Sequence, residues 1–377
     1  MAAMELTEEQ AAVRDVVREF AREEIEPTAL EADRDQRFPE DVWDGLADLD
    51  LTGLTVPEAY GGYDADPVTA AVVNEEVAAG MLAVATALSV HSLATSCIAE
   101  FGSEDQRERW LPEMAAGRPV GAFALSEPHA GSNPAEMSTE ASRDGDKYVI
   151  DGEKQWITNG ERAGVYVLFA KTDRDDPDSV TQFLVPGDAD GLTVGEKEDK
   201  LGLRASDTTS LTFDDVRIPA ENRLTEEGKG LSAAFHILTG GRIAIAAQSV
   251  GLARRALEEA MAYSQERDQF GGPIADIQTI RHKLAEMATR TRAARLLTRD
   301  AAQKRAAGDA ALEASMAKYF ASEAAMFVTN EAVQIHGGYG YVTESEVERL
   351  YRDAKITEIY EGTTEIQKTV IARELLD

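Results

Sequence analysis

A block of strand-like sequence interrupts an otherwise helical chain, and this change of texture most limits the possible folds. Short runs rich in β-branched and aromatic residues occur at 148–150, 155–158, 165–170, 180–185, 192–194 and 211–213, with Gly and Pro between them. The dipeptides Asp151-Gly152 and Asn159-Gly160 are typical of tight turns between paired strands. No segment of helical period separates the runs, which argues against an alternating α/β unit and predicts an antiparallel sheet or small barrel.

The segments on either side of this block have helical periodicity. The capping-box sequence Thr7-Glu8-Glu9-Gln10 predicts the start of the first helix. After Gly228-Lys229-Gly230, apolar residues recur every three or four positions from Ile277 to Ala301, the spacing of a helix packed along a neighbour. We therefore expect an α+β multidomain chain with an all-helical N-terminal domain (1–120), a middle antiparallel β-domain (121–228) and a C-terminal helical bundle (229–377).

The charge of the chain excludes several classes of partner. Its 377 residues include 69 acidic and 38 basic side chains, which give a formal net charge of −31. Such a surface repels nucleic acid and anionic membranes, so we expect neither as a partner. The same acidity keeps a protein hydrated in concentrated salt, which favours a halophilic, salt-accumulating cytoplasm. The alternative is an ordinary acidic bacterial protein.

Other features argue against disulfides, metals and targeting. One cysteine, Cys97, excludes an internal disulfide and is expected to be buried. The five histidines show no ligand spacing, so we expect no metal site. The polar start, Met1–Gln10, does not resemble a signal peptide, and we expect a cytoplasmic location. The stretch Val77–Ala99 lacks charged residues and is long enough to span a bilayer, but its Ala, Ser and Thr content favours buried helices over an integral membrane span.

Two stretches near the middle of the chain could contact a planar ligand. Residues 122–133 lie where the first helical region meets the sheet, a usual place for a cleft, and their small residues and hydroxyls leave backbone amides accessible. Trp156, at the end of a predicted strand, offers a flat apolar face beside the Thr158 hydroxyl. The alternatives are a plain interdomain loop and a core tryptophan.

Two further stretches in the C-terminal region could approach a phosphate or a cofactor tail. Arg267 precedes Gly271 at a predicted helix end, a plausible phosphate clamp, although a solvated surface arginine is the commoner role. Gly337 and Gly338 follow another helix and allow close approach of a second backbone. No strand precedes them and no βαβ unit surrounds them, so any flavin is not held by a Rossmann fold.

The stretch Ile359–Gln367 contains the candidate catalytic residue. Glu361 is a candidate base, and Gly362 beside it removes any side chain that would block a ligand from the backbone. Free backbone N–H groups here could donate to a polarised carbonyl or a phosphate. The alternative is an ordinary turn at a helix end.

In this order and at these separations, the motifs closely resemble the acyl-CoA dehydrogenase family over essentially the whole chain. The C-terminal helical region looks most like the short-chain, butyryl-type members. The resemblance implies the family's three-domain fold with a C-terminal four-helix bundle, FAD as cofactor and a homo-oligomer, usually a tetramer. It also implies α,β-dehydrogenation of a short- or medium-chain acyl-CoA to trans-2-enoyl-CoA, with electrons passing to an electron-transfer flavoprotein, as in fatty acid β-oxidation.

The resemblance also assigns residues by motif. Glu361 falls on the position of the α-proton base, and Ser132, Arg242 and Gly362 fall on substrate-binding positions. The FAD positions of the same subunit are Phe123, Leu125, Ser126, Gly131, Ser132, Trp156, Ile157, Thr158, Thr363 and Glu365. The positions that reach the FAD of a neighbouring subunit are Arg267, Phe270, Gln278, Gln334, Gly337 and Gly338.

Departures from the family pattern leave some details open. Some relatives carry the base on the helix that here has Gly241, so Glu361 is the only matching carboxylate. Thr239, His129, Asn133 and Pro134 replace more usual residues, which leaves the contacts to CoA undefined. No cation occurs in Ala83–Val90, which weakens a glutaryl-type specificity. The remaining alternatives are an acyl-CoA oxidase, a branched or aromatic acyl-CoA dehydrogenase, and a non-catalytic flavin-binding scaffold.

Overall fold

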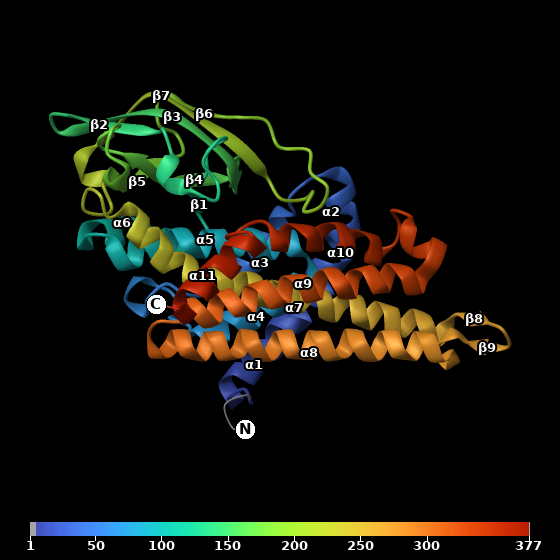
Figure 1. The fold of residues 1–377 in the computed structure, drawn as a ribbon. Helices are drawn as coiled ribbons and strands as arrows, with labels where there is room; N and C mark the ends of the chain where they lie inside the picture. The colour runs from blue at the N-terminus through green and yellow to red at the C-terminus, as the bar shows by residue number, and fades with distance from the viewer. Residues whose placement is uncertain (1–4, 377) are drawn as a thin grey trace.

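A sheet domain lies over one side of an elongated helical body in the computed structural model, which describes residues 5–376 (Figure 1). The first helical region contains α1 (Glu8–Phe20), α2 (Ala29–Asp35), α3 (Glu40–Asp48), α4 (Pro67–Gly80), α5 (Leu82–Phe101) and α6 (Glu104–Ala115). The predicted capping box is confirmed, because the Gln10 backbone N–H donates to Thr7 Oγ1 at 3.1 Å and the Thr7 N–H donates back to Gln10 Oε1. Each of α4 and α5 is almost wholly buried, so these two helices form the centre of the core.

The middle region is a seven-stranded sheet. Its strands are β1 (Val120–Ala124), β2 (Glu140–Asp144), β3 (Lys147–Thr158), β4 (Ala163–Lys171), β5 (Val180–Pro186), β6 (Leu192–Val194) and β7 (Thr208–Pro219). They follow the order β1-β4-β2-β3-β7-β6, with β5 paired to β4. The expected antiparallel pairing holds for β2–β3, β3–β7, β4–β5 and β6–β7, but β1 pairs with β4 in parallel. Parallel pairing is possible because a long crossover connection separates these two strands in the sequence.

The predicted turn at Asp151-Gly152 is wrong. These residues lie inside β3, where the pairing with β7 shifts register between Ile150 and Gly152. Gly152 has φ +148°, and a Cβ at this position would lie 2.6 Å from Thr139 Oγ1. A glycine is therefore required for a bulge that bends β3, not for a reversal. Asn159-Gly160 does lie in the turn between β3 and β4.

The C-terminal region consists of long helices packed side by side (Figure 1). They are α7 (Gly230–Glu266), α8 (Gln278–Ala307), α9 (Ala311–His336), α10 (Glu346–Ala354) and α11 (Thr364–Leu376), and the short hairpin β8 (Asp268–Gln269) and β9 (Gly272–Pro273) precedes α8. The predicted apolar periodicity of α8 is confirmed, since Met287, Thr291, Ala294, Thr298 and Ala301 are buried. Helix α7 also packs along α4, which joins the two helical regions into one core.

Two helices are long and apolar enough, by length and composition alone, to cross a membrane. They are α5 and α7, and 78% and 61% of their most apolar windows are buried inside the protein. The uncharged stretch Val77–Ala99 is divided between α4 and α5 by extended backbone at Met81. Burial against other helices favours the interpretation that these are core helices. Cys97 on α5 is buried, as predicted.

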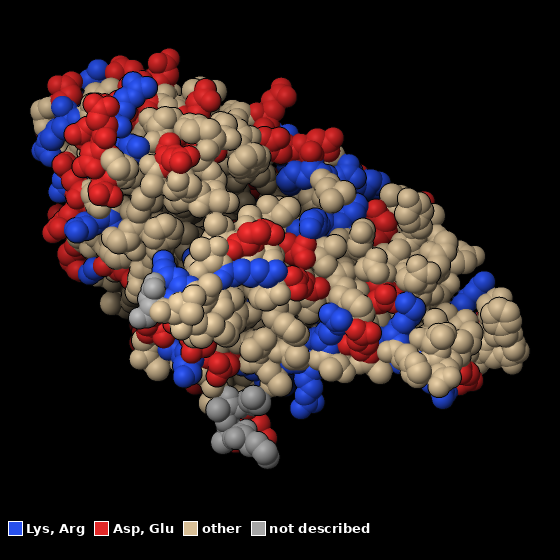
Figure 2. Space-filling model, viewed as in Figure 1, with Lys and Arg blue, Asp and Glu red and all other residues tan. Residues whose placement is uncertain are grey.

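On the face of the molecule drawn in Figure 2, the acidic side chains are distributed and are not concentrated in one patch. Figure 2 shows Asp and Glu interspersed with Lys and Arg over the sheet domain and along the helices. Inside the helical body, Glu75 and Glu76 on α4 are buried and accept hydrogen bonds from Arg295 and Arg18. These charge-assisted contacts tie α1, α4 and α8 together.

Candidate active site

A cavity of about 200 Å³ lies between the sheet, α5 and α7, and Glu361 lines it. The structure brings to this cavity nearly all residues assigned above to the catalytic, substrate and same-subunit cofactor positions. These are Phe123, Leu125, Ser126, Gly131, Ser132, Trp156, Ile157, Thr158, Arg242, Glu361 and Gly362. Thr363 and Glu365 follow directly at the start of α11 but do not line the cavity.

Trp156 presents its ring to this cavity because β3 is irregular at its end. The pairing of β3 with β7 shifts register between Lys154 and Ile157, and Trp156 has φ +57°. A bulge of this kind redirects a side chain that would otherwise follow the alternation of the strand. As a result the tryptophan is 56% exposed, so the core alternative is wrong, while Ile157 beside it is buried.

The loop at 125–132 is fixed to the sheet by a buried carboxylate. Glu127 accepts hydrogen bonds from Ser138 N at 2.7 Å, Thr139 Oγ1 at 2.6 Å and Lys154 Nζ at 2.8 Å. Burial alone would raise the pKa of Glu127, but the Lys154 ammonium and these hydrogen bonds lower it to about 2. Lys154 Nζ also donates to Leu125 O at 3.1 Å. The loop is therefore held by an ion pair that remains charged at neutral pH.

The Glu361 carboxylate lies directly against the backbone of α7. A Cβ built at Gly241 would lie 2.6 Å from Glu361 Oε2 and 3.3 Å from Leu93 Cδ2, so only glycine leaves room for the acid. Oε2 is buried and has no hydrogen-bond partner among the described residues. An unpaired carboxylate oxygen that faces a cavity is free to accept a proton from a ligand.

Opposing electrostatic effects act on Glu361. Burial raises the pKa of its carboxyl to about 7, and the nearby cations Arg242 and Lys318 limit this rise. Arg242 on α7 is itself buried, with Nη1 3.4 Å from Ser315 Oγ and Nε unpartnered. A carboxylate with a pKa near neutrality is suited to take a proton at physiological pH.

The backbone around Glu361 is held in a conformation that few side chains adopt. Glu361 has φ +54° and Gly362 has φ +87°. Gln367 Nε2, one turn into α11, donates to Glu361 O at 3.0 Å and to Gly362 O at 2.9 Å. The Tyr360 hydroxyl lies 3.3 Å from Gln248 Oε1 on α7. Strain of this kind is typical of functional sites, where surrounding contacts maintain it.

The residues assigned to a neighbouring subunit's cofactor lie elsewhere. Arg267, Phe270, Gln278, Gln334, Gly337 and Gly338 are all exposed and surround the β8–β9 hairpin at one end of the bundle (Figure 1). Phe270 at the hairpin tip is 95% exposed. The Arg267 guanidinium lies 5.8 Å from the centre of the Tyr339 ring, and both residues line an open cleft of about 650 Å³. Within one chain, the structure does not bring this group to Glu361.

Several cavity residues were not identified from the sequence. Val90 and Leu93 come from α5, Phe235 and Leu238 from α7, and Ile366 from α11. Phe235, Leu238 and Arg242 follow the spacing of three and four that places residues on one helix face. This spacing could have linked the two apolar residues to the predicted substrate arginine.

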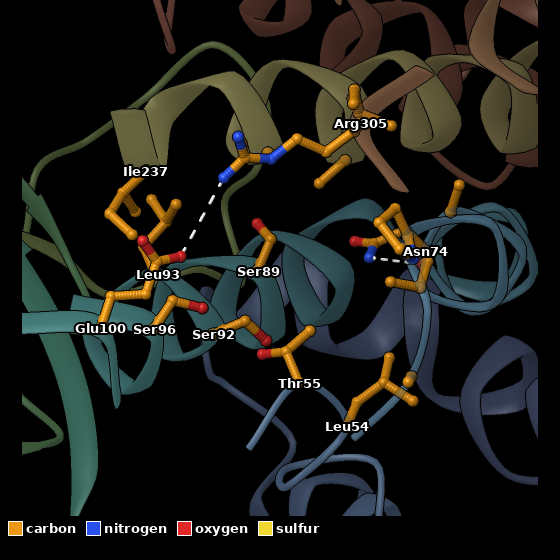
Figure 3. A pocket seen from close by; sticks show the side chains of 18 residues that line it. Leu54, Thr55, Asn74, Ser89, Ser92, Leu93, Ser96, Glu100, Ile237 and Arg305 are labelled. Atoms are coloured by element: carbon orange, nitrogen blue, oxygen red, sulfur yellow. Dashed lines mark hydrogen bonds and ion pairs between the residues drawn. The ribbon is translucent and has the colours of Figure 1, made fainter. Parts of the chain in front are cut away.

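A second cavity of about 270 Å³ is drawn in Figure 3, and Leu93 lines both this cavity and the first. Its walls carry the hydroxyls of Ser89, Ser92 and Ser96, all on one face of α5. Thr55 Oγ1, also in the lining, is buried without a partner. The chain therefore leaves accessible, partly polar volume next to the Glu361 cavity. No group of three His, Cys, Asp or Glu residues within 5–376 could hold a metal ion.

Three sequence models match the chain: "Acyl-CoA dehydrogenase, N-terminal domain" at 7–118, the middle domain at 122–216 and the C-terminal domain at 228–376. An acyl-CoA dehydrogenase of Bacillus subtilis is 46% identical over 99% of both chains. The butyryl-CoA dehydrogenase structure of Megasphaera elsdenii has a TM-score of 0.96 and 41% identity over 99% of both chains.

A chain in a structure titled for the electron transferring flavoprotein of Acidaminococcus fermentans has a TM-score of 0.97 and 40% identity, again over 99% of both chains. The predicted three-domain α+β fold is thus confirmed. Proteins of the matched family are oxidoreductases that use FAD. The agreement in sequence and fold extends over the whole length, and the chain therefore belongs to the acyl-CoA dehydrogenase family.

Proposed function

We propose that this protein dehydrogenates a short- or medium-chain acyl-CoA to the trans-2-enoyl-CoA, with Glu361 as the base that removes the α-proton. The observation that carries this proposal is the buried, unpartnered Oε2 of Glu361, which shares a cavity with the exposed face of Trp156. A non-catalytic flavin scaffold would have no use for a buried carboxylate with a pKa of about 7.

The residues around the cavity suit a reaction that removes a weakly acidic proton. The α-proton of a thioester is too weakly acidic for an unassisted carboxylate. We infer that the backbone N–H of Glu361 donates to the thioester carbonyl and stabilises negative charge as it develops. Substrate that fills the cavity excludes water and so strengthens Glu361 as a base. Arg242 and Ser132, which line the same cavity, are the candidates for orienting the substrate, and Gly362 leaves room for it.

The cavity fits the flat ring of FAD. The exposed Trp156 indole offers an apolar face, and Ser126 and Thr158 beside it offer hydroxyls. Phe123, Leu125, Gly131, Ser132 and Ile157 complete this proposed contact surface. Thr363 and Glu365, which follow Gly362 at the start of α11, are proposed as further FAD contacts outside the cavity. FAD held by these residues would supply the acceptor for the β-hydrogen, which leaves the substrate as a hydride.

The second group of proposed cofactor residues requires another subunit. Arg267, Phe270, Gln278, Gln334, Gly337 and Gly338 are exposed and remote from Glu361 in the same chain. We propose that they contact the FAD of a neighbour, which makes the active enzyme a homo-oligomer, namely a tetramer. An aromatic side chain as exposed as Phe270 supports a partner at this hairpin.

We also propose an electron-transfer flavoprotein as the electron acceptor. The similar chain in the Acidaminococcus fermentans structure, whose title names such a protein, supports this assignment. A cytoplasmic, halophilic setting and a role in fatty acid β-oxidation remain parts of the same proposal.

An anaerobic titration tests the reaction. The purified holoenzyme, in high salt, is titrated with butyryl-, octanoyl-, isovaleryl- and glutaryl-CoA while the flavin absorbance is followed. We expect prompt bleaching by the straight-chain thioesters and slower or no bleaching by glutaryl-CoA. Bleaching by none of them would overturn the assignment and favour the scaffold.

The Glu361→Gln variant tests the base. It should retain FAD and bind butyryl-CoA but bleach about 10² to 10⁴ times more slowly, the usual contribution of a general base. A near-normal rate would exclude Glu361 from this role.

Rapid reoxidation of the reduced enzyme by air, at the rate of turnover, would favour the oxidase alternative.

A further inference from the structure

One buried lysine behind the active-site loop has no role in the reaction proposed above. Lys318 lies in the middle of α9, and its side chain is fully buried. It is the only Lys or Arg between Ala311 and His336. A charged ammonium is rarely buried without a strong reason, because desolvation disfavours its charge.

The contacts of Lys318 point to the loop that carries the base. Its Nζ donates to Gly362 O at 2.7 Å. Burial lowers the pKa of Lys318 to about 8, and the largest effect opposing this shift comes from Glu361, followed by Glu358. The lysine thus binds the backbone next to the base and has the base as its main counter-ion.

We propose that Lys318 is a positioning residue that anchors the Gly362 carbonyl and supplies a cation that keeps Glu361 ionised until it takes the proton. This inference rests on the proposed role of Glu361. Gln367 donates to the same carbonyl from α11, so two donors from different helices hold the loop. With the loop fixed, the Glu361 carboxylate stays against Gly241.

The charge is needed because burial acts against the base. Burial raises the pKa of Glu361 to about 7, so that the group would partly hold a proton before substrate arrives. Arg242 opposes this from α7 and Lys318 opposes it from α9. Before the reaction, the site therefore holds one anion, Glu361, and two cations, Arg242 and Lys318. When Glu361 takes the substrate proton it becomes neutral and no longer offsets the charge of either cation. Lys318 favours the ionised base over the protonated acid.

Other charged groups around the site limit the effect. Glu358 lies just before the loop, and Glu365 and Arg373 lie on α11, with smaller influences on Lys318 or Arg242. Glu365 and Arg373 are exposed to solvent, and Glu358 pairs with Lys355, so their charges are screened. Removal of the Lys318 charge should therefore change the titration of Glu361 and should not be masked by its neighbours.

Three variants separate the anchor from the charge. Lys318→Met removes both the donor and the cation, while Lys318→Gln keeps a donor and removes only the cation. Lys355→Met is the matched control, because Lys355 is a half-exposed lysine that pairs with Glu358. For each holoenzyme, the rate of flavin bleaching by butyryl-CoA is measured from pH 5.5 to 9, together with KM and Tm.

We expect the acidic limb of the rate profile to move to higher pH by about one unit in both Lys318 variants and to stay in place in Lys355→Met. At pH 9, Lys318→Gln should approach the wild-type rate, whereas Lys318→Met should be about tenfold slower with little change in KM. Tm should fall modestly in Lys318→Met, because the variant loses the hydrogen bond to Gly362 O and leaves the Glu361 carboxylate with one fewer cation.

Two results would overturn the inference. An acidic limb that stays at the wild-type position shows that the charge does not act on the base. A fall in Tm with an unmoved limb shows a structural role alone. If wild-type enzyme fails to bleach with butyryl-CoA, the proposed function fails first, and this outcome is distinct from bleaching with an unmoved limb.

Discussion

Burial disfavours the ionised form of Glu361, and this effect bears both on its proposed role as a base and on the stability of the fold. Burial raises the pKa of its carboxyl to about 7 from an ordinary value of 4.5, and Arg242 and Lys318 only partly compensate. A carboxyl group whose pKa is raised by folding lowers the free energy of unfolding at a pH where the group is ionised. This decrease can be measured, because it depends on pH.

The Glu361→Gln variant should therefore be more stable than wild type at pH 8. Between pH 4.5 and 7 the unfolded chain releases this proton while the folded chain retains it, so the stability of the wild type falls as pH rises through that window. The amide has no such dependence. Differential scanning calorimetry of both holoenzymes at pH 5 and pH 8 should show a higher Tm for the variant at pH 8 and a smaller difference at pH 5. An equal difference at both values contradicts a raised pKa.

Gly241 and Gly240 form a matched pair on α7. Gly241→Ala places a Cβ 2.6 Å from Glu361 Oε2, so the base must move, whereas a Cβ at Gly240 meets no atom within 4 Å. We expect Gly241→Ala to lower the rate with butyryl-CoA by at least about tenfold, since small displacements of a catalytic group are costly. Gly240→Ala should keep that rate and gain up to about 1 kcal/mol of stability from helix propensity. Equal rates in the two variants would show that Glu361 does not need the space.

The local sequence predicted the proposed base and the tryptophan proposed to contact the flavin, but not the residues that pack against the site or hold its loop. Glu361 beside Gly362, and Trp156 at a strand end, are recognisable from their immediate neighbours. Leu93 and Lys318 reach the site from α5 and α9, far away in the sequence, and only the tertiary packing brings them together. A lone lysine in an apolar helix was the one available signal for Lys318.

Among the elements, α5 controls how far the site extends. Leu93 lines both the Glu361 cavity and the second cavity, and on α5 the second is bordered by the small side chains of Ser89, Ser92 and Ser96 (Figure 3). Leu93→Ala should join the two volumes and shift the preference from butyryl-CoA towards octanoyl-CoA. The ratio of kcat/KM values for the two substrates should change by about tenfold, the usual effect of a few methylene groups in a pocket. An unchanged ratio would mean that the acyl chain does not pass Leu93.

Helices and strands were predictable where apolar residues recur with a regular period, but the pairing of the strands was not predictable. The three-four spacing of α8 arises from burial along a single helix face, so it appears in the sequence. The parallel pairing of β1 with β4 and the bulge at Gly152 depend on partners distant in the chain. The Asp-Gly pair has the same local chemistry in a hairpin and in a bulge, and only the partner strand distinguishes them.

At the scale of the molecule, the two groups of proposed cofactor residues cannot meet within one chain. Arg267→Ala should therefore weaken FAD retention without disturbing the protomer, because Arg267 is exposed and its guanidinium lies over the ring of Tyr339, which is also exposed. We expect a lower flavin-to-protein ratio after gel filtration in dilute solution and an unchanged far-UV spectrum. Arg34→Ala, at another exposed arginine, is the control. Full flavin content in Arg267→Ala would argue against a contribution from a second subunit.

The net charge of −31 sets the conditions in which the whole molecule is stable. Most of these charges are on the surface and repel one another over about 10 Å at 0.1 M salt, a range that shrinks to about 3 Å at 1 M. Tm should therefore rise by several degrees between 0.1 and 2 M KCl, and the rise should be steepest below about 0.5 M, where screening changes most. Sucrose is the control, because it stabilises by exclusion from the surface and leaves the charges unscreened. A KCl dependence no larger than that of sucrose would support the ordinary acidic protein. A steep rise would support the halophilic setting, and it would require every measurement on this enzyme to be made in high salt.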